Sequence, residues 1–531
     1  MSKRLAGAFA ALAMVCGAST SALAEQAATI EARSAPGGVI VTWRLAEPTT
    51  RVAFLSESVI RDLWTVTTPG LTLKDGGVEG AEPFDRFEIR IAPDAAEVDR
   101  TYMGLARVGT GHVLYGPGLE LQGMDAVLTA RPVAGEATLP TTDAVKGYVY
   151  LGPKEVVMRR DGAAVVTSAS APAFLATTMR DGFFAAQAFY GARLGRNLPY
   201  EPTLIVTTDS PGPNPFRGDV TDTGVISTRF HGSSWNAPPP EVAGQLSTFV
   251  WHETFHLWNG HGVTTVDGDT APWLHEGGAE YGAVVAAVST GVIDETEGRT
   301  SLAQRLNGCR KALGNADYDP RRLRSGSAIY NCGVVVQWIA DLETRQTSGG
   351  TRDVFDLWKV MLDAGRASEG YGVTDFRALL QADSAVGVLM DGPGAARWSG
   401  IEARLMALGV TLEDRPGPSD YRLAALFHLN DENCAGGGAG FYSVEQGIKL
   451  DSGDKCGPLS GDPLLASVEG HDPASEATAM FFAVQARCAA SLPVRYRTQD
   501  GRLIEAKCGK PLVAPKAWAV TAAPPLATRA S

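Results

Sequence analysis

The first third of the chain alternates between hydrophobic and polar residues, and a period of two is typical of half-buried strands. Residues 39–43 and 87–91 follow this pattern, and residues 156–167 are expected to form a hairpin that turns at an Asp-Gly pair. Clusters of Gly, Pro and Asp separate these segments. We therefore expect a β-rich domain of sandwich type over residues 25–170.

After this domain the apolar residues recur at helical spacing instead. A helix is expected over residues 173–194, then short strands over 203–207 and 224–229, and then two more helices. The strand at 224–229 is either an ordinary internal strand or a sheet edge that holds an extended peptide by backbone pairing. Together these elements predict a mixed domain of helices and strands over residues 171–292.

A helical domain is expected over residues 293–415, because further segments there show helical periodicity. The predicted helices lie near residues 296–313, 327–346, 351–365, 373–383 and 394–408.

Beyond Pro416 the sequence becomes richer in glycine and in short strand-like segments. Its elements resemble those of a PDZ domain, in which a glycine loop holds a peptide carboxylate on backbone N–H groups. We place this PDZ-like domain at residues 416–512 and expect the Ala- and Pro-rich tail, residues 513–531, to be disordered. The elements are a glycine loop at 436–441, a strand at 442–450, a strand and turn at 461–470, and a hairpin over 494–506.

The candidate chemistry lies in the first helix after residue 240, which contains His-Glu-Thr-Phe-His at residues 252–256. In a helix, His252 and His256 are one turn apart, so both imidazoles leave the same face. Glu253 lies beside them, where its carboxylate can reach a water on a bound metal ion. The alternative interpretation is a buried helix with two core histidines.

A second helix supplies the carboxylates that a metal site needs. Residues 269–272 indicate a helix start, and Glu276 follows, twenty residues past His256. A catalytic zinc takes three protein ligands and keeps one position for water or substrate. Glu280 is one turn further, where it can accept the outer N–H of a ligand histidine. The sequence therefore predicts one Zn2+ ion bound by His252, His256 and Glu276.

The composition of the 531-residue chain is that of a soluble globular protein, with 44% hydrophobic and 20% charged residues. Its formal net charge of -12 argues against nucleic acid or an anionic membrane surface as the main partner. No segment reaches the length of a transmembrane helix. The sequence does not define an oligomeric state.

Residues 1–24 have the features of a secretory signal peptide: a basic start, a short apolar run and a small-residue cleavage site. The mature protein is therefore expected to be exported, either periplasmic or secreted. Cleavage removes Cys16, one of 7 cysteines, and leaves an even number in an oxidising compartment. Among the possible pairings, the spacing favours neighbours: Cys309–Cys332, Cys434–Cys456 and Cys488–Cys508.

The segments 252–259 and 273–277 resemble those of the gluzincin metallopeptidases. Within that class they look most like the glycyl aminopeptidase family, whose members join a β domain, a thermolysin-like catalytic domain, a helical domain and a PDZ domain. The resemblance implies a multidomain α+β fold with residues 171–292 as the thermolysin-like domain. It also implies Glu253 as the general base, with Glu280 and Asn259 next to the metal ligands.

In these enzymes a tyrosine near the start of a later helix stabilises the oxyanion, and Tyr330, followed by Gly333, matches that position. From the residues alone, Tyr330 would be read as a packed aromatic. Two departures from the family pattern stand out. Cys332 replaces the lysine usual before that glycine, and no Gly-x-Met-Glu-Asn segment, which holds a substrate's free amine in related aminopeptidases, is visible around residues 224–229.

These observations predict an exported zinc metallopeptidase that acts on a peptide or protein substrate, with aminopeptidase action as one form of that activity. Glu253 would pass the proton of the attacking water to the leaving amine, and Tyr330 would donate a hydrogen bond to the oxyanion. One alternative is a non-catalytic protein that captures peptides with the PDZ-like domain on a zinc scaffold. The other is a zinc hydrolase that acts on a non-peptide bond.

Overall fold

The computed structural model describes residues 26–99, 101–141, 144–195, 198–212, 216–221, 223–236, 240–324, 326–435, 440–444 and 447–527. The expected signal peptide lies outside these ranges, as do residues 436–439 of the expected glycine loop. In the described part of the chain, no helix combines the length and the apolar character needed to cross a membrane.

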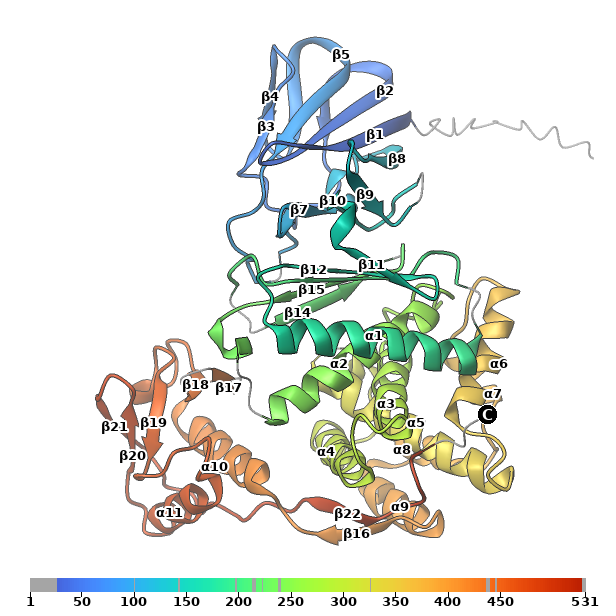
Figure 1. Ribbon diagram of the computed structural model, residues 1–531. Helices are drawn as coiled ribbons and strands as arrows, with labels where there is room; N and C mark the ends of the chain where they lie inside the picture. Colours follow the sequence, from blue (N-terminus) through green and yellow to red (C-terminus); the bar gives the residue numbers. More distant parts are fainter. Residues whose placement is uncertain are drawn as a thin grey trace, which may run out of the picture.

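Two sheets form the amino-terminal β-rich part, drawn in blue and blue-green at the top of Figure 1. One has the order β3-β5-β2-β1-β8, with β4 beside β5, and the other has the order β6-β7-β10-β9. Fully buried residues of both sheets, such as Trp43, Ile89 and Leu114, share one core. The alternation in the sequence therefore places every second residue inside, as in half-buried strands. Its strands are β1 (Gln26–Ala35), β2 (Gly38–Ala53), β3 (Trp64–Val66), β4 (Leu71–Lys74), β5 (Gly77–Ile91), β6 (Leu105–Val108), β7 (Gly111–Tyr115), β8 (Met124–Arg131), β9 (Glu136–Leu139) and β10 (Tyr148–Pro153).

A third sheet, which we call the mixed sheet, has the order β11-β12-β13-β15-β14 and lies between the β-rich part and the helices (Figure 1). The predicted hairpin is present as β11 (Val157–Arg160) and β12 (Ala163–Thr167), but β12 pairs with β13 (Thr203–Thr207) in this sheet. Its assignment to the amino-terminal domain is therefore wrong. The cause is that β12 is apolar on both faces, because Val165 packs with the helices and Val166 with the β-rich part.

One edge of the mixed sheet is β14 (Phe216–Val220), which is the last strand in the sheet order. The strand predicted at 224–229 is β15 (Val225–Phe230), and it pairs with β13 on one side and with β14 on the other. Of the two interpretations of that segment, the internal strand is correct. All six residues of β15 are buried, which is the pattern of an internal strand.

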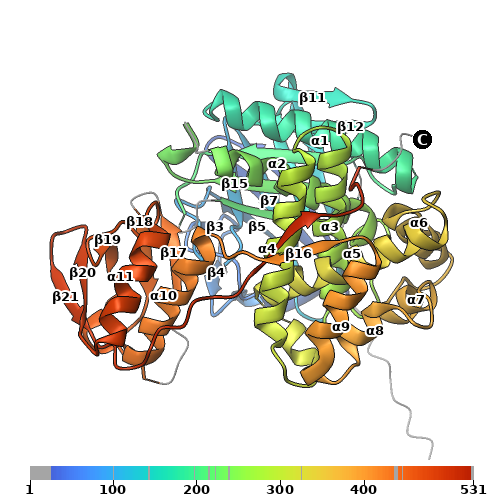
Figure 2. The ribbon, with the colours of Figure 1, turned by 90° about the horizontal axis from the view of Figure 1, so that it is seen from below.

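Helices cover the face of the mixed sheet that points away from the β-rich part (Figures 1 and 2). The long ones lie where the periodicity predicts them, and the helix expected over 173–194 has those bounds. The segment expected as one helix over 373–383 ends earlier, because the Ser384 side chain caps the start of a separate helix. The helices are α1 (Ala173–Leu194), α2 (Pro240–Asn259), α3 (Trp273–Ser289), α4 (Glu295–Leu313), α5 (Ser327–Thr347), α6 (Val354–Arg366), α7 (Val373–Ala378), α8 (Ala385–Met390) and α9 (Gly394–Ala407).

The carboxy-terminal module, residues 418–512, is an antiparallel sheet of order β17-β18-β19-β20-β21 with two helices, drawn in orange and red in Figure 2. The single strand expected at 442–450 is a hairpin instead, because Gly447 has a φ of 135° that glycine accommodates. The two helices were not predicted, because exposed apolar residues such as Phe482 of α11 obscure the helical spacing of the buried ones. The elements are α10 (Pro418–Asn433), β17 (Gly440–Val444), β18 (Gly447–Asp451), β19 (Leu464–Val468), α11 (Ala477–Ala489), β20 (Val494–Thr498) and β21 (Leu503–Ala506).

The expectation of a disordered tail from residue 513 is wrong for residues 518–522. They form β22 (Trp518–Ala522), which pairs antiparallel with β16 (Thr411–Asp414). The Arg310 guanidinium of α4 lies 4.3 Å from the ring centroid of Trp518, and the Asn307 side chain bonds to the Trp518 backbone at 2.8 and 2.9 Å. These tertiary contacts, which composition does not report, return the chain from the module to the helices (Figure 2).

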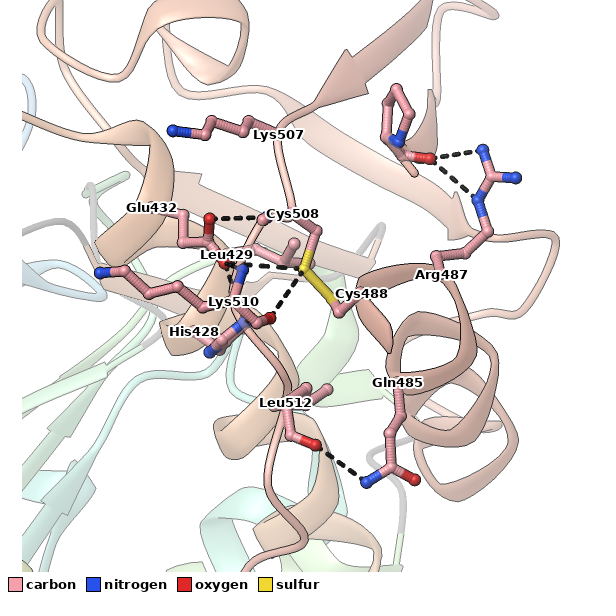
Figure 3. The surroundings of a disulfide bond; sticks show 12 residues. His428, Leu429, Glu432, Gln485, Arg487, Cys488, Lys507, Cys508, Lys510 and Leu512 are labelled. Carbon is pink, nitrogen blue, oxygen red and sulfur yellow. Dashed lines mark hydrogen bonds and ion pairs between the residues drawn. A yellow bond between two sulfur atoms is a disulfide. The ribbon is translucent and has the colours of Figure 1, made fainter. Parts of the chain in front are cut away.

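The three disulfides predicted from spacing are all present: Cys309–Cys332, Cys434–Cys456 and Cys488–Cys508. Figure 3 shows the last of them, which joins α11 to the segment after β21. His428 lies close enough to its sulfur atoms to suggest a metal cluster. Because each sulfur is already bonded to the other, this group is a structural crosslink and not a metal site.

Glu97, in the segment between β5 and β6, connects the β-rich part to the mixed sheet. Its carboxylate accepts hydrogen bonds from Arg229 Nε of β15 at 3.0 Å and Arg217 Nη1 of β14 at 3.3 Å. It also lies 2.9 Å from Nε2 of His231. Burial alone would raise the pKa of Glu97, but the hydrogen bond with His231 and the charge of Arg229 outweigh it and hold the pKa at about 2.

We expect Glu97→Gln to lower the free energy of unfolding by about 3 kcal/mol at neutral pH. The carboxyl changes its pKa from 4.5 to about 2 on folding, so this stabilisation is fully present above pH 4.5 and is lost as the pH falls toward 2. Denaturation measured from neutral pH to pH 3 should therefore show that the difference in free energy of unfolding between the parent and Glu97→Gln becomes smaller in acid. Glu79→Gln, which removes exposed pairs with Arg51 and Lys74, is the control and should cost no more than about 1 kcal/mol. A difference of constant size down to pH 3 would contradict the assignment.

Candidate active site

Three side-chain donors from α2 and α3 converge on one point. The Nε2 atoms of His252 and His256 lie 3.1 Å apart, and each lies 3.3 Å from Oε2 of Glu276. The one-turn spacing on α2 aims both imidazoles at α3, and α3 begins at Trp273, which places Glu276 in its first turn. The structure thus brings together the residues that the sequence singled out as metal ligands.

The size of this triangle fits a single zinc ion. In a tetrahedral zinc site with bonds of about 2.0–2.2 Å, two ligand atoms lie about 3.3–3.5 Å apart. The observed separations of 3.1 and 3.3 Å agree with that geometry. Two imidazole nitrogens and one carboxylate oxygen are donors that zinc accepts, and three protein donors leave a fourth position for water or substrate.

The negative charge of the carboxylates around the donors also favours a bound cation. Burial alone would lower the pKa of His252, but the carboxylates of Glu276 and Glu280 raise it to about 10. Burial, together with the nearby carboxylate of Glu276, raises the pKa of Glu253 to about 7. Three carboxylates thus share a half-buried region, and a divalent ion between the donors would compensate their charge.

A chain of contacts fixes the orientation of His252. Its Nδ1 lies 3.0 Å from Oε2 of Glu280, whose other oxygen is paired with the guanidinium of Arg305 on α4. Burial would raise the pKa of Glu280, but His252 and Arg305 hold it at about 2, so the carboxylate stays ionised. An ionised carboxylate beside Nδ1 favours a proton on that atom, which leaves the lone pair of Nε2 for a metal.

His256 is oriented by a different residue of the same helix. Its Nδ1 lies 3.0 Å from Oδ1 of Asn259, and the Nδ2 of Asn259 donates to the backbone oxygen of His275 at 2.8 Å. Because the amide nitrogen is committed to a carbonyl, the amide oxygen faces the imidazole and accepts its N–H. Asn259 thus holds the tautomer that points Nε2 toward Glu276.

Two hollows of about 340 Å³ each adjoin the donors, and His252, Glu253 and Tyr330 line both of them. One hollow extends toward Arg305 on α4. The other extends toward β14 and Tyr102 of the β-rich part. The donors therefore lie in a cleft that continues on both sides, and the edge strand of the mixed sheet forms part of its wall.

Tyr330 lies in the first turn of α5, and its ring centroid is 6.0 Å from that of His252. Burial raises the pKa of Tyr330, and the carboxylates of Glu276 and Glu253 raise it further. The phenol therefore stays protonated at physiological pH and can act only as a neutral hydrogen-bond donor or acceptor in the cleft.

Sequence reasoning did not identify Arg305, His275 or the residues of β14 as part of the site. Arg305 lies 25 positions after Glu280 in a different helix, and no local motif links the two. His275 Nε2 lies 3.5 Å from Oε1 of Glu276 and could have been suspected from its place next to a predicted ligand. Asp219 and Gly218 of β14 line the cleft only because of how the sheet is ordered.

Two glycines allow α5 to lie directly against α3 beside the donor Glu276. A Cβ on Gly277 would be 2.3 Å from the backbone of Gly333, and a Cβ on Gly333 would be 2.4 Å from the backbone oxygen of Trp273. Both distances are too short for any side chain. The close approach sets the position of Tyr330, three residues earlier on α5, relative to Glu276 on α3.

The fold is similar to that of an aminopeptidase N family protein from Idiomarina loihiensis, with 13% sequence identity, coverage of 93% of this chain and 98% of that chain, and a TM-score of 0.57. Lower scores relate it to a two-domain M1 zinc metallopeptidase mutant bound to L-tryptophan (15% identity, 71% and 94% coverage, TM-score 0.36) and to native yeast LTA4 hydrolase (9% identity, 76% and 72% coverage, TM-score 0.38). No protein-family model and no curated protein matches the chain. The first likeness shows that the fold is shared over nearly the whole of both chains.

We expect Gly333→Ala to lower the free energy of unfolding by about 2 kcal/mol or more, because the new Cβ overlaps backbone that cannot move aside. The change should also weaken zinc binding, since α5 would push against the first turn of α3, which carries Glu276. Denaturant unfolding and calorimetric zinc titration measure the two effects.

The matched control is Gly244→Ala on α2, where nothing lies within 4 Å of the new Cβ. This variant should be unchanged or more stable by up to about 1 kcal/mol, the helix-propensity gain of alanine. Equal stability of the Gly333→Ala and Gly244→Ala variants would contradict the proposed packing of α3 on α5.

Proposed function

We propose that this protein is a zinc-dependent peptidase. The observation that carries the proposal is the triangle of His252, His256 and Glu276, whose dimensions fit one Zn2+ with an open fourth position. An open position is the mark of a catalytic zinc and not of a structural one. The likeness of the fold to an aminopeptidase N family protein supports the same conclusion.

Each group in the cleft has a role in hydrolysis. Zn2+ held by the three donors would polarise the scissile carbonyl and lower the pKa of the attacking water. Glu253, which lines the same hollows, takes the proton of that water and passes it to the leaving amine. Tyr330 donates a hydrogen bond to the oxyanion, and one such donor is worth about 3 kcal/mol.

The substrate is proposed to bind in an extended conformation along β14. In the described part of the chain, β14 is a terminal strand of its sheet, and its residues 218–220 line the cleft beside the donors. Backbone pairing with a sheet edge holds a peptide with little regard to its side chains. Aminopeptidase specificity is a finer form of this proposal, and a free α-amine would have to find its acceptor near this strand.

The alternative of a non-catalytic peptide-binding protein is less well supported. A scaffold needs neither the base nor the oxyanion donor, yet Glu253 and Tyr330 both line the hollows at the donors. The PDZ-like assignment of the carboxy-terminal module stays a prediction, because most of the expected carboxylate-binding loop lies outside the described residues. We also propose that the protein works outside the cytoplasm, which its three disulfides support.

Glu253→Gln should retain one zinc per chain and lose peptide hydrolysis by about 10³-fold, because the amide cannot accept the proton of the water. Zinc content by atomic absorption and kcat on a peptide substrate measure the two quantities. The control is Glu369→Gln, which makes the same exchange at an exposed position and should leave both unchanged. A Glu253→Gln protein as active as the parent would rule out the mechanism.

Glu276→Ala should lose zinc itself, because only two protein donors remain. The parent should lose activity to a chelator and regain it when zinc is added, whereas the variant should stay inactive at that zinc concentration. Digesting a peptide library that contains free and acetylated amino termini, with and without chelator, tests the peptide bond as the target. Chelator-insensitive cleavage, or full zinc occupancy in the variant, would show that these donors do not form the site.

A further inference from the structure

One disulfide lies beside the candidate site, at the position where the sequence departs from the pattern of related enzymes. We propose that the Cys309–Cys332 disulfide positions Tyr330 for oxyanion stabilisation, so that full activity requires this pair to be oxidised. The proposal rests on the proposed peptidase function. It makes Cys309 and Cys332 positioning residues that act through Tyr330.

Tyr330 needs such support because of its place at the start of α5. The helix begins at Ser327, so Tyr330 lies in the first turn, where backbone N–H groups lack a full set of intrahelical partners and the Ile329 N–H reaches the Gly326 oxygen at 3.3 Å. The N-cap residue is Gly326, which has a φ of 65° and provides no side-chain cap. A first turn without a cap frays easily, so its geometry depends on tertiary contacts.

One face of α4 supplies those contacts. Arg305, Gly308 and Cys309 have the three- and four-residue spacing that places them on one side of a helix. The Arg305 guanidinium donates to Oδ1 of Asn331 at 3.2 Å, and the Asn331 side chain lies over Gly308, where a Cβ would come within 2.3 Å. The disulfide then joins the next residues of the two helices.

The opposite side of α5 is held by α3, through the close approach of Gly333 to Gly277. Residues 331–333 are therefore fixed from both sides, and Tyr330 is the next residue toward the free start of the helix. Of these contacts only the disulfide is covalent. Both of its cysteines are fully buried, so the crosslink belongs to the packed core and not to the surface.

The disulfide also joins the two helices that carry Arg305 and Tyr330, two residues that line the cleft beside His252. Arg305 on α4 pairs with Glu280, which contacts Nδ1 of His252, while Tyr330 on α5 lines the same hollow as His252. The disulfide sets the distance between these helices. A change in that distance would displace the phenol relative to the donors, and a displacement of about 1 Å at a reacting centre costs on the order of 100-fold in rate.

Formation of the bond makes the site dependent on redox conditions. The thiols of Cys309 and Cys332 lose two protons and two electrons and form one S–S bond, while an external disulfide accepts them and becomes two thiols. A reducing cytosol keeps the pair as thiols, and an oxidising compartment closes it. Full activity would then arise only after export.

The test compares two double variants. Cys309→Ala/Cys332→Ala removes the proposed clamp, and Cys488→Ala/Cys508→Ala removes a disulfide of similar span and burial in the carboxy-terminal module (Figure 3). We expect the first to lower kcat by at least about tenfold, with KM within about twofold of the parent and one zinc per chain. The second should leave kcat within about twofold.

A thermodynamic cycle separates positioning from general damage. In a Tyr330→Phe background, removal of Cys309–Cys332 should lower kcat no further, because both changes remove the same hydrogen bond. Amide hydrogen exchange over residues 327–333 should rise in the Cys309/Cys332 variant and stay unchanged in the Cys488/Cys508 variant.

Additive losses of kcat in this cycle, or unchanged exchange over residues 327–333, would overturn the proposal. The proposed function fails in a different way, which is equal hydrolysis by the parent and Glu253→Gln. In that case the exchange measurement still decides whether the disulfide orders the first turn of α5.

Discussion

The approach of one carboxylate oxygen to two imidazole nitrogens is the interaction on which the site depends. Oε2 of Glu276 lies 3.3 Å from both His252 and His256, in a region shared with the carboxylates of Glu253 and Glu280. Ionised groups that leave water cost several kcal/mol each unless they are paired. The ion pair between Arg305 and Glu280 offsets part of this cost, and a divalent cation between the donors would offset the rest. Stability of the site and its capacity to bind zinc therefore have the same electrostatic origin.

The helices that carry these donors are held by contacts that permit little adjustment. Trp251 and Phe255 of α2 pack edge-on against Tyr190 of α1, with ring centroids 5.7 and 5.0 Å apart. On the other side, Gly277 and Gly333 bring the α3 and α5 backbones together where no side chain fits. A close-packed core transmits a shift in one helix to the next. The position of Tyr330 is thus a property of the whole helical layer and not of its own turn alone.

Local pattern and covalent spacing account for what the sequence predicts well. The bounds of α1, the one-turn spacing of His252 and His256, and the pairing of neighbouring cysteines all follow from rules that act within a few tens of residues. Structural features that depend on contacts between segments far apart in the sequence could not be predicted from these local rules. The hairpin β11–β12 was assigned to the wrong domain because its second strand is sandwiched between two layers, and β22 was missed because its partner β16 lies about a hundred residues earlier. The role of Arg305 depends on how α4 packs against α3, which no motif encodes.

The carboxylate that β14 contributes to the cleft is already engaged by neighbouring side chains. Asp219 is the carboxylate residue of β14 that lines the cleft, and it accepts hydrogen bonds from Arg229 Nη2 at 2.5 Å and from the Tyr148 hydroxyl at 3.2 Å. Arg229 is buried and also bonds Glu97, so an incoming amine would have to compete with an arginine that is already held in place. Breaking such a buried pair costs about 3–5 kcal/mol. Asp219 is therefore a poor candidate for the acceptor of a substrate's free amine.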